Sequence, residues 1–208
     1  MADIVLADEH PVVRIGLRAV LAVARDFRVT AEVGHSTALL AELARVSCDL
    51  LVVEPALPDL PVVELIGRVR RLPAAPRVLA FGIRREEDFA LPLIELGAAG
   101  YLHKCSPPEQ ILVAVRTVLG GDTYLPPGVA RSLLAGGNGQ GGVPHLALSR
   151  REMGVLLMLG AGRPLKRIAD EFNLSIKTVS TYRSRVLQKL GLASNADLTR
   201  YVIERGLV

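Results

Sequence analysis

Acidic and basic side chains stand just after short apolar runs at several points in the first half of the chain. Asp8 and Glu9 follow the run IVLA, Glu54 follows LLVV, and Lys104 lies two residues after AGYL. Carboxylates and an ammonium group that meet in one pocket stabilise each other's charged forms. The alternative is that each of these side chains is solvated separately at the end of its own strand. The choice depends on whether the apolar runs bring these residues together.

Those apolar runs alternate with segments whose apolar residues recur at helical spacing. The runs cover 4–7, 29–33, 50–53, 77–81 and 99–102, and the helical spacing covers 11–24, 37–46, 62–71, 86–96 and 107–119. This alternation predicts an α/β fold, a five-stranded parallel, doubly wound sheet with helices on both faces. Ligands bind outside the carboxyl ends of the strands in such sheets, so we expect the three carboxylates and Lys104 to share one pocket.

The character of the sequence changes after a short predicted helix over 128–134. The segment AGGNGQGG, residues 135–142, contains five glycines and is typical of a flexible linker. We therefore expect a domain over 1–122, a linker helix and Gly-rich linker over 123–144, and a second domain over 145–208.

The last segment has only helical patterns, and four helices are expected. Ser149 and Glu152 have the spacing of a capping box at the start of the first helix. The second is predicted over 164–172. The third, over 175–191, has Ser175 as a candidate cap and Gly191 as a stop. The fourth is predicted over 195–206, where dimer contact and core packing are equal alternatives for its apolar residues.

The charge is distributed unevenly between the two halves. Residues 1–144 carry 14 Lys and Arg against 16 Asp and Glu, a balance of −2, whereas residues 145–208 carry 11 against 5, a balance of +6. Such an asymmetry favours a polyanionic partner for the second half. A merely solvated basic surface is the alternative.

The remaining composition excludes several protein classes. No apolar stretch reaches the ~18–20 residues of a membrane span, and the start of the chain lacks the pattern of a signal peptide. Cys48 and Cys105 have no metal-ligand spacing, so we expect free thiols in a reducing cytoplasm. We find no nucleophile–base pair and no nucleotide fingerprint, so no enzymatic activity, metal or cofactor is predicted.

The third helix of the tail has two contrasting faces. Its apolar stripe consists of Val179, Tyr182, Val186 and Leu190. The opposite face carries Lys177, Thr181, Ser184 and Gln188, flanked by Ser180 and Arg185. Small polar and basic side chains make a poor core surface and a suitable surface for the major groove of DNA. A solvated helix of a protein-interaction module is the alternative.

Taken together, the segments IVLADEHPVVRIGLRAVL, LLVVEPALPD and AAGYLHK and the helical tail resemble bacterial response regulators of the NarL/FixJ family. These are two-component system proteins that join a phosphoryl-accepting receiver domain with a flavodoxin-like fold to a LuxR-type helix-turn-helix domain. The resemblance covers nearly the whole chain. It implies transcription regulation through double-stranded DNA, with the third helix of the tail as recognition helix.

The resemblance also assigns roles to individual residues. Asp8 and Glu9 match the acidic pair that helps to hold Mg²⁺, and Lys104 matches the lysine that contacts the phosphoryl group. Tyr101 matches the aromatic switch position, and Pro58 the proline shortly after the phosphorylation site. In the recognition helix we expect Ser180, Thr181 and Ser184 at base edges. Phosphate contacts are expected from Lys166, Lys177, Thr178, Arg183, Arg185 and Lys189.

Two positions depart from the family pattern. Glu54 stands where the phosphoaccepting aspartate is expected, and Gly82 replaces the switch Thr or Ser. The extra methylene of Glu54 displaces the attacking oxygen, and a misplacement of about 1 Å costs ~10²-fold in rate. Glu54 is long enough to contact Lys104 and imitate part of the phosphorylated state. A pocket that serves only as scaffold is an equal alternative. Gly82 also leaves room for Tyr101 to turn inward.

From the sequence we predict a cytoplasmic, sequence-specific DNA-binding regulator with an atypical receiver that is not controlled by aspartyl phosphorylation. A homodimer on a two-half-site operator is expected. Two alternatives remain open: a regulator whose receiver pocket senses a small molecule, and one that is controlled by a partner through heterodimerisation with another regulator.

Overall fold

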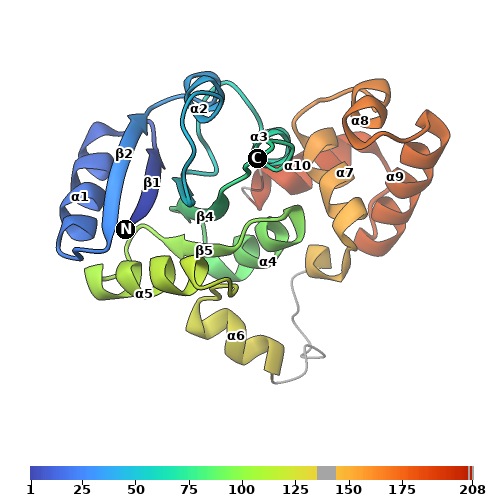
Figure 1. Cartoon of the computed structure of the whole chain (residues 1–208). Helices are drawn as coiled ribbons and strands as arrows, with labels where there is room; N and C mark the ends of the chain where they lie inside the picture. Colours follow the sequence, from blue (N-terminus) through green and yellow to red (C-terminus); the bar gives the residue numbers. More distant parts are fainter. Residues whose placement is uncertain (135–143, 206, 208) are drawn as a thin grey trace.

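The computed structural model describes residues 1–134, 144–205 and 207, which form an α/β domain followed by a helical domain (Figure 1). The Gly-rich segment that was predicted as a linker, 135–142, lies outside the described residues. The structure is consistent with the predicted order of elements, although several of their ends shift by one to three residues.

The α/β domain contains one parallel sheet. Its strands are β1 (Ala2–Ala7), β2 (Phe27–Val33), β3 (Leu50–Val53), β4 (Arg77–Gly82) and β5 (Gly100–His103), in the spatial order β2-β1-β3-β4-β5. The two strands that begin earlier than their apolar runs, β1 and β2, pair from Ala2 with Phe27. Backbone pairing therefore extends these two strands beyond the apolar runs from which they were predicted.

Five helices cover the two faces of this sheet. They are α1 (Pro11–Ala22), α2 (Ser36–Leu43), α3 (Val62–Val69), α4 (Glu86–Leu96) and α5 (Pro108–Leu119). Alternate residues of each strand point to opposite faces: Leu50 and Val52 pack with α1 and α5, whereas Leu51 and Val53 belong to the core beneath α2, α3 and α4. The continuous apolar runs thus reflect strands buried on both sides. The further helix α6 (Pro127–Leu134) follows α5.

The helical domain consists of the short 3₁₀ helix η1 (Pro144–Ala147) and of α7 (Arg150–Gly160), α8 (Leu165–Phe172), α9 (Ile176–Leu190) and α10 (Asn195–Glu204). The capping box of Ser149 and Glu152 is present, and the Ser175 side chain accepts a hydrogen bond from the Thr178 amide. Gly191 ends α9 with φ at +64°, a conformation that glycine adopts without strain.

The two domains pack against each other through α3 and α4 on one side and η1 and α7 on the other (Figure 1). Their apolar interiors are continuous, because Leu65 of α3 and Leu93 of α4 belong to the same buried cluster as Val155 and Leu156 of α7. Leu198 and Val202 of α10 are fully buried in that cluster, so core packing accounts for these two residues, while Ile203 is exposed.

No helix within the described part of the chain combines the length and the apolar character that crossing a membrane requires.

Candidate functional site

The carboxyl edge of the sheet gathers the side chains that the strand ends predicted. Asp8 follows β1, Glu54 follows β3, and Lys104 comes directly after β5. Backbone hydrogen bonds fix these positions, since the Glu54 amide donates to the Ala7 carbonyl and the Lys104 amide to the Gly82 carbonyl, each at 2.8 Å. Pairing of parallel strands therefore places the residues at one edge although they are far apart in sequence.

Lys104 joins the two carboxylates into one ion cluster. Its Nζ lies 2.6 Å from Asp8 Oδ2 and is also paired with Glu54 Oε2. Asp8 and Glu54 are 2% and 5% exposed, and the Lys104 side chain is 11% exposed. Glu54 Oε1 accepts a hydrogen bond from the Ala56 amide at 3.2 Å. We call Asp8, Glu54 and Lys104 the charged pocket.

The electrostatic balance of the charged pocket favours the ammonium form of Lys104. Burial by itself lowers the pKa of Lys104, but its interactions with Asp8 and Glu54 outweigh burial and raise the pKa above its ordinary value. The Lys104 ammonium therefore lies between two buried acidic side chains.

Glu9 and His10 follow Asp8 at the edge of the charged pocket. Glu9, the second member of the predicted acidic pair, is exposed. The backbone amide of His10 donates to Asp8 Oδ1 at 2.9 Å, which engages the other oxygen of that carboxylate. The structure thus brings Asp8, Glu54 and Lys104 together and leaves Glu9 on the rim.

Tyr101 fills the space that Gly82 leaves. The tyrosine is completely buried, and its hydroxyl donates to the Arg84 carbonyl at 2.7 Å. A Cβ atom at position 82 would lie 3.1 Å from the Tyr101 hydroxyl and 3.3 Å from Glu54 Oε1, closer than most real Cβ contacts. Burial and the charge of Glu54 raise the pKa of Tyr101, so its hydroxyl stays neutral.

A small cavity of about 250 Å³ connects the rim of the charged pocket to the helical domain. Glu54, Arg84 and Phe89 line it on the α/β side, and Leu157 and Leu207 on the other. The sequence contained no signal for this connection, because its two sides are more than 60 residues apart along the chain.

The polar face of α9 is open to solvent. Lys177, Thr181, Ser184 and Arg185 are exposed, whereas Val179 and Val186 on the opposite side are completely buried. The hydroxyls of Thr181 and Ser184 donate to the carbonyls of Lys177 and Ser180, at 3.0 and 3.1 Å. Each hydroxyl therefore presents its lone pairs to a partner outside the helix.

The predicted phosphate-contacting residues lie in different surroundings. Lys166, at the start of α8, is exposed, and Thr178 is half-buried beside Ser175. The Lys189 ammonium lies 2.7 Å from Glu152 Oε2, and the Nε of Arg183 donates to Asn195 Oδ1 at 2.5 Å. Lys189 and Arg183 thus already have partners within the domain.

Sequence reasoning missed the polar contacts between the domains. His145 is completely buried, with Nε2 3.2 Å from the Asp88 carbonyl and Nδ1 2.9 Å from the Tyr201 hydroxyl. Because a carbonyl only accepts, Nε2 carries the proton and Nδ1 accepts from the tyrosine. Burial lowers the pKa of His145, which favours this neutral form. Glu64 of α3 is buried and pairs with Arg163 at 3.2 Å.

Comparison with known families assigns both domains. Residues 4–116 match the response regulator receiver domain, and residues 146–202 match the bacterial regulatory proteins of the luxR family. The two matches cover the sheet with its charged pocket and the helices that include the polar face of α9.

Curated relatives match over the full length of the chain. The transcriptional activator protein ExaE of Pseudomonas putida is 33% identical over 208 residues, covering 99% of this chain and 97% of its own. The oxygen regulatory protein NreC of Staphylococcus carnosus is 30% identical over 214 residues, covering 99% and 98%. The response regulator UvrY of Escherichia coli K12 is 27% identical over 209 residues, covering 100% and 96%.

Solved structures share the fold over both domains. RcsB from Salmonella enterica serovar Typhimurium, bound to promoter P1flhDC in the presence of the phosphomimetic BeF₃⁻, superposes with a TM-score of 0.68 at 26% identity. The match covers 97% of this chain and 98% of that one.

Proposed function

Since the chain belongs to the NarL/FixJ response regulators, DNA-binding transcription factors with a receiver and a LuxR-type domain, we propose that it is a sequence-specific regulator whose receiver is not controlled by aspartyl phosphorylation. One observation carries this proposal: in the buried charged pocket, Lys104 is already bound to both Asp8 and Glu54. The position beside Lys104 that a phosphoryl group would take is thus occupied by the carboxylate of Glu54.

The local chemistry supports this reading of Glu54. One of its oxygens pairs with Lys104 and the other accepts from the Ala56 amide, so both are engaged. In-line attack on phosphorus requires a free and correctly placed oxygen. Gly82 provides no hydroxyl for an incoming phosphoryl group, and the tyrosine hydroxyl occupies the adjacent space.

The donor set of the charged pocket does not fit a resident Mg²⁺. Mg²⁺ takes carboxylates and waters in octahedral geometry, but here the ammonium of Lys104 lies between the two buried carboxylates and Glu9 is on the rim. Within the described residues no three acidic, histidine or cysteine side chains converge as metal ligands. We therefore propose no catalytic function for the pocket.

DNA contact is assigned to the polar face of α9. We propose that Ser180, Thr181 and Ser184 meet base edges, because they are short side chains along the centre of the recognition helix. Phosphates are assigned to Lys166, Lys177, Thr178, Arg183, Arg185 and Lys189. Exposure favours Lys177, Arg185 and Lys166 among them, whereas Lys189 and Arg183 would first have to leave Glu152 and Asn195.

A homodimer accounts for an apolar surface on the receiver. Val12 and Ile15 of α1 and Val113 of α5 are 74%, 54% and 55% exposed, and the two helices are neighbours. Exposed valine and isoleucine on adjacent helices favour a protein contact. We propose that two copies of the chain meet at this surface. We also propose that the chain divides into a receiver domain over 1–122, a linker over 123–144 and a DNA-binding domain over 145–208. Heterodimerisation with another regulator would use the same surface.

A second candidate function is sensing of a small molecule by the receiver pocket. The cavity of about 250 Å³ beside Glu54 favours it, because Leu157 and Leu207 of the DNA-binding domain line that cavity. An occupant there would contact both domains.

Two measurements test the main proposal. Incubation with acetyl phosphate and Mg²⁺ should leave the intact mass unchanged, and a stoichiometric phosphoryl group on Glu54 would refute the proposal. Glu54→Gln should weaken operator affinity or self-association, because the neutral amide cannot hold Lys104 as a carboxylate does. Glu95→Gln, at an exposed position of α4, is the matched control.

Unchanged operator affinity and self-association in Glu54→Gln would favour a pocket that serves only as scaffold over one in which Glu54 imitates part of the phosphorylated state. Genome-wide mapping of bound DNA with wild type and Glu54→Gln then connects the pocket to promoters. A full-length protein without salt-dependent affinity for duplex DNA would contradict the regulatory function itself.

A further inference from the structure

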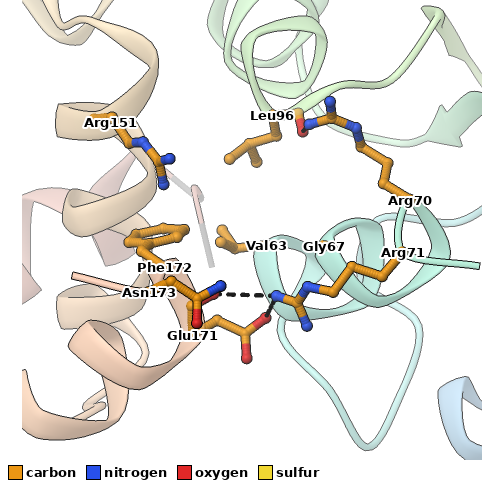
Figure 2. Close-up of a pocket in the computed structure, with 9 residues that line it drawn as sticks. All are labelled: Val63, Gly67, Arg70, Arg71, Leu96, Arg151, Glu171, Phe172 and Asn173. Atoms are coloured by element: carbon orange, nitrogen blue, oxygen red, sulfur yellow. Dashed lines mark hydrogen bonds and ion pairs between the residues drawn. The ribbon is translucent and has the colours of Figure 1, made fainter.

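A larger cavity, of about 400 Å³, lies between the two domains and away from the charged pocket (Figure 2). Val63, Gly67, Arg70 and Arg71, in and just after α3, form one wall with Leu96 of α4. The facing wall comes from Arg151 of α7 and from Glu171, Phe172 and Asn173 at the end of α8. The volume lies within the range of ~300–1,000 Å³ that is usual for small-molecule sites.

The lining of this interdomain cavity is cationic. Three arginines and a single carboxylate, Glu171, line it, and that carboxylate is paired with Arg71 at 2.5 Å (Figure 2). Arg70 donates a long hydrogen bond, 3.3 Å, to the Leu96 carbonyl. The ion pairs of the described residues leave Arg70 and Arg151 without a carboxylate partner. Two positive charges, one from each domain, are therefore available to a ligand.

The same cavity has an apolar and aromatic part. Val63 and Leu96 project into it from the receiver, and the ring of Phe172 projects from the DNA-binding domain (Figure 2). The Arg151 guanidinium lies over the Phe172 ring, 5.3 Å from its centre, so a cation and an aromatic group are adjacent in the wall of the cavity. Planar guanidinium groups bind carboxylates and phosphates with paired hydrogen bonds, and aromatic rings favour flat partners.

We infer that this interdomain cavity binds a small organic anion with a flat apolar body and a phosphate or carboxylate group. The anionic group lies between Arg70 and Arg151, and the flat body lies against Phe172, Val63 and Leu96. Such a ligand contacts both domains, so its binding free energy stabilises their docked arrangement. The inference does not depend on the fate of Glu54 or on DNA binding.

Calorimetric titration of the full-length protein with four probes tests the inference. The probes are 1-naphthyl phosphate, 1-naphthoate, uncharged 1-naphthol and inorganic phosphate. We expect one naphthyl anion to bind per chain. Comparison of the affinities of 1-naphthyl phosphate and 1-naphthoate then shows which anionic group is preferred. Naphthol and inorganic phosphate should each bind at least about tenfold more weakly, because each lacks one half of the recognition.

Variants locate the site. Arg70→Gln and Arg151→Gln should each weaken binding of the naphthyl anion by about tenfold, since each removes a charge-assisted contact. The affinities of Arg70→Lys and Arg151→Lys should lie between those of the wild type and the glutamine variants, because lysine keeps the charge but lacks the planar guanidinium group. Arg45→Gln, an exposed arginine after α2, should bind like wild type.

Three results would overturn the inference. They are the absence of binding by either naphthyl anion at millimolar concentration, equal binding by inorganic phosphate, and unchanged affinity in both glutamine variants. Equal binding by phosphate would indicate attraction of anions to surface arginines without a built site. Thermal unfolding of each variant verifies that it is folded. Because operator DNA is absent from this titration, its outcome is independent of the proposed regulatory function.

Discussion

The charged pocket of the receiver and the polar face of α9 carry their charges in opposite ways. In the pocket, Asp8, Glu54 and Lys104 are removed from water and satisfy one another. On α9, Lys177 and Arg185 are exposed. A buried charge is tolerated only when it is paired, whereas an exposed charge costs little to keep available. The charges of the pocket are therefore satisfied within the protein, whereas those of α9 remain available to a polyanion.

Removing the cation of the charged pocket should have the largest effect. Lys104→Met leaves two buried carboxylates without a neutralising cation and should lower the free energy of unfolding by about 3–5 kcal/mol. Urea unfolding of the full chain measures this loss. Lys177→Met, the matched change on α9, should stay within about 0.5 kcal/mol of wild type. Equal effects of the two substitutions would abolish the contrast between the regions.

The same cluster has a pH signature. The pKa of Lys104 is raised in the folded protein, so its contribution is fully present below the unfolded pKa of about 10.4 and is lost as pH rises through the higher folded value. Wild type should therefore lose stability above about pH 10.4, and Lys104→Met should lack this component.

Base reading by α9 should give the next largest effect. Because the Thr181 hydroxyl donates to the Lys177 carbonyl, it offers an acceptor to amino groups of adenine or cytosine. Thr181→Val should lower affinity by about 1–3 kcal/mol for the operator and much less for unrelated DNA. Competition titrations compare the two. A uniform loss across all sequences would assign Thr181 to the backbone instead.

Phosphate contacts should respond differently. Lys177→Ala or Arg185→Ala should weaken binding to every duplex and reduce the slope of log affinity against log salt by about 1 for each lost contact. Titrations at several salt concentrations measure this slope. Glu204→Gln, at an exposed position at the end of α10, is the control for a change of charge elsewhere in the domain. An unchanged slope would place the residue outside the interface.

The interface between the domains should show the smallest effect. Burial lowers the pKa of His145, so docking is strongest above the unfolded pKa of about 6.5 and weakens as pH falls below it, by at most ~1.4 kcal/mol per pH unit. The nearby charge of Arg205 adds to this shift, and Asp88 opposes it. Small-angle scattering at pH 7.5 and 5.5 should detect domain separation. His145→Leu should remove that pH dependence, and a persisting dependence would assign it to other groups.

Much of the fold could be predicted from local patterns. Continuous apolar runs such as LLVV indicated strands buried on both faces, and Ser149 with Glu152 and Ser175 with Gly191 marked helix ends through hydrogen bonds within a few residues. The convergence of Asp8, Glu54 and Lys104 also followed from sequence, because parallel strands end at a common edge. Only the tertiary structure placed Glu9 on the rim.

By itself, the sequence determined the order of elements, the identity of the pocket residues and the two-faced character of α9, because each depends on spacing along one element or on the ends of parallel strands. Only the tertiary structure decided that Tyr101 turns towards Gly82 and that His145 and Glu64 bind the opposite domain. It also decided that Arg70 and Arg151 share a cavity. The hydrogen bonds of Tyr101, His145 and Glu64 join residues 17, 57 and 99 positions apart. They arise from the docking of whole surfaces, which no local periodicity encodes.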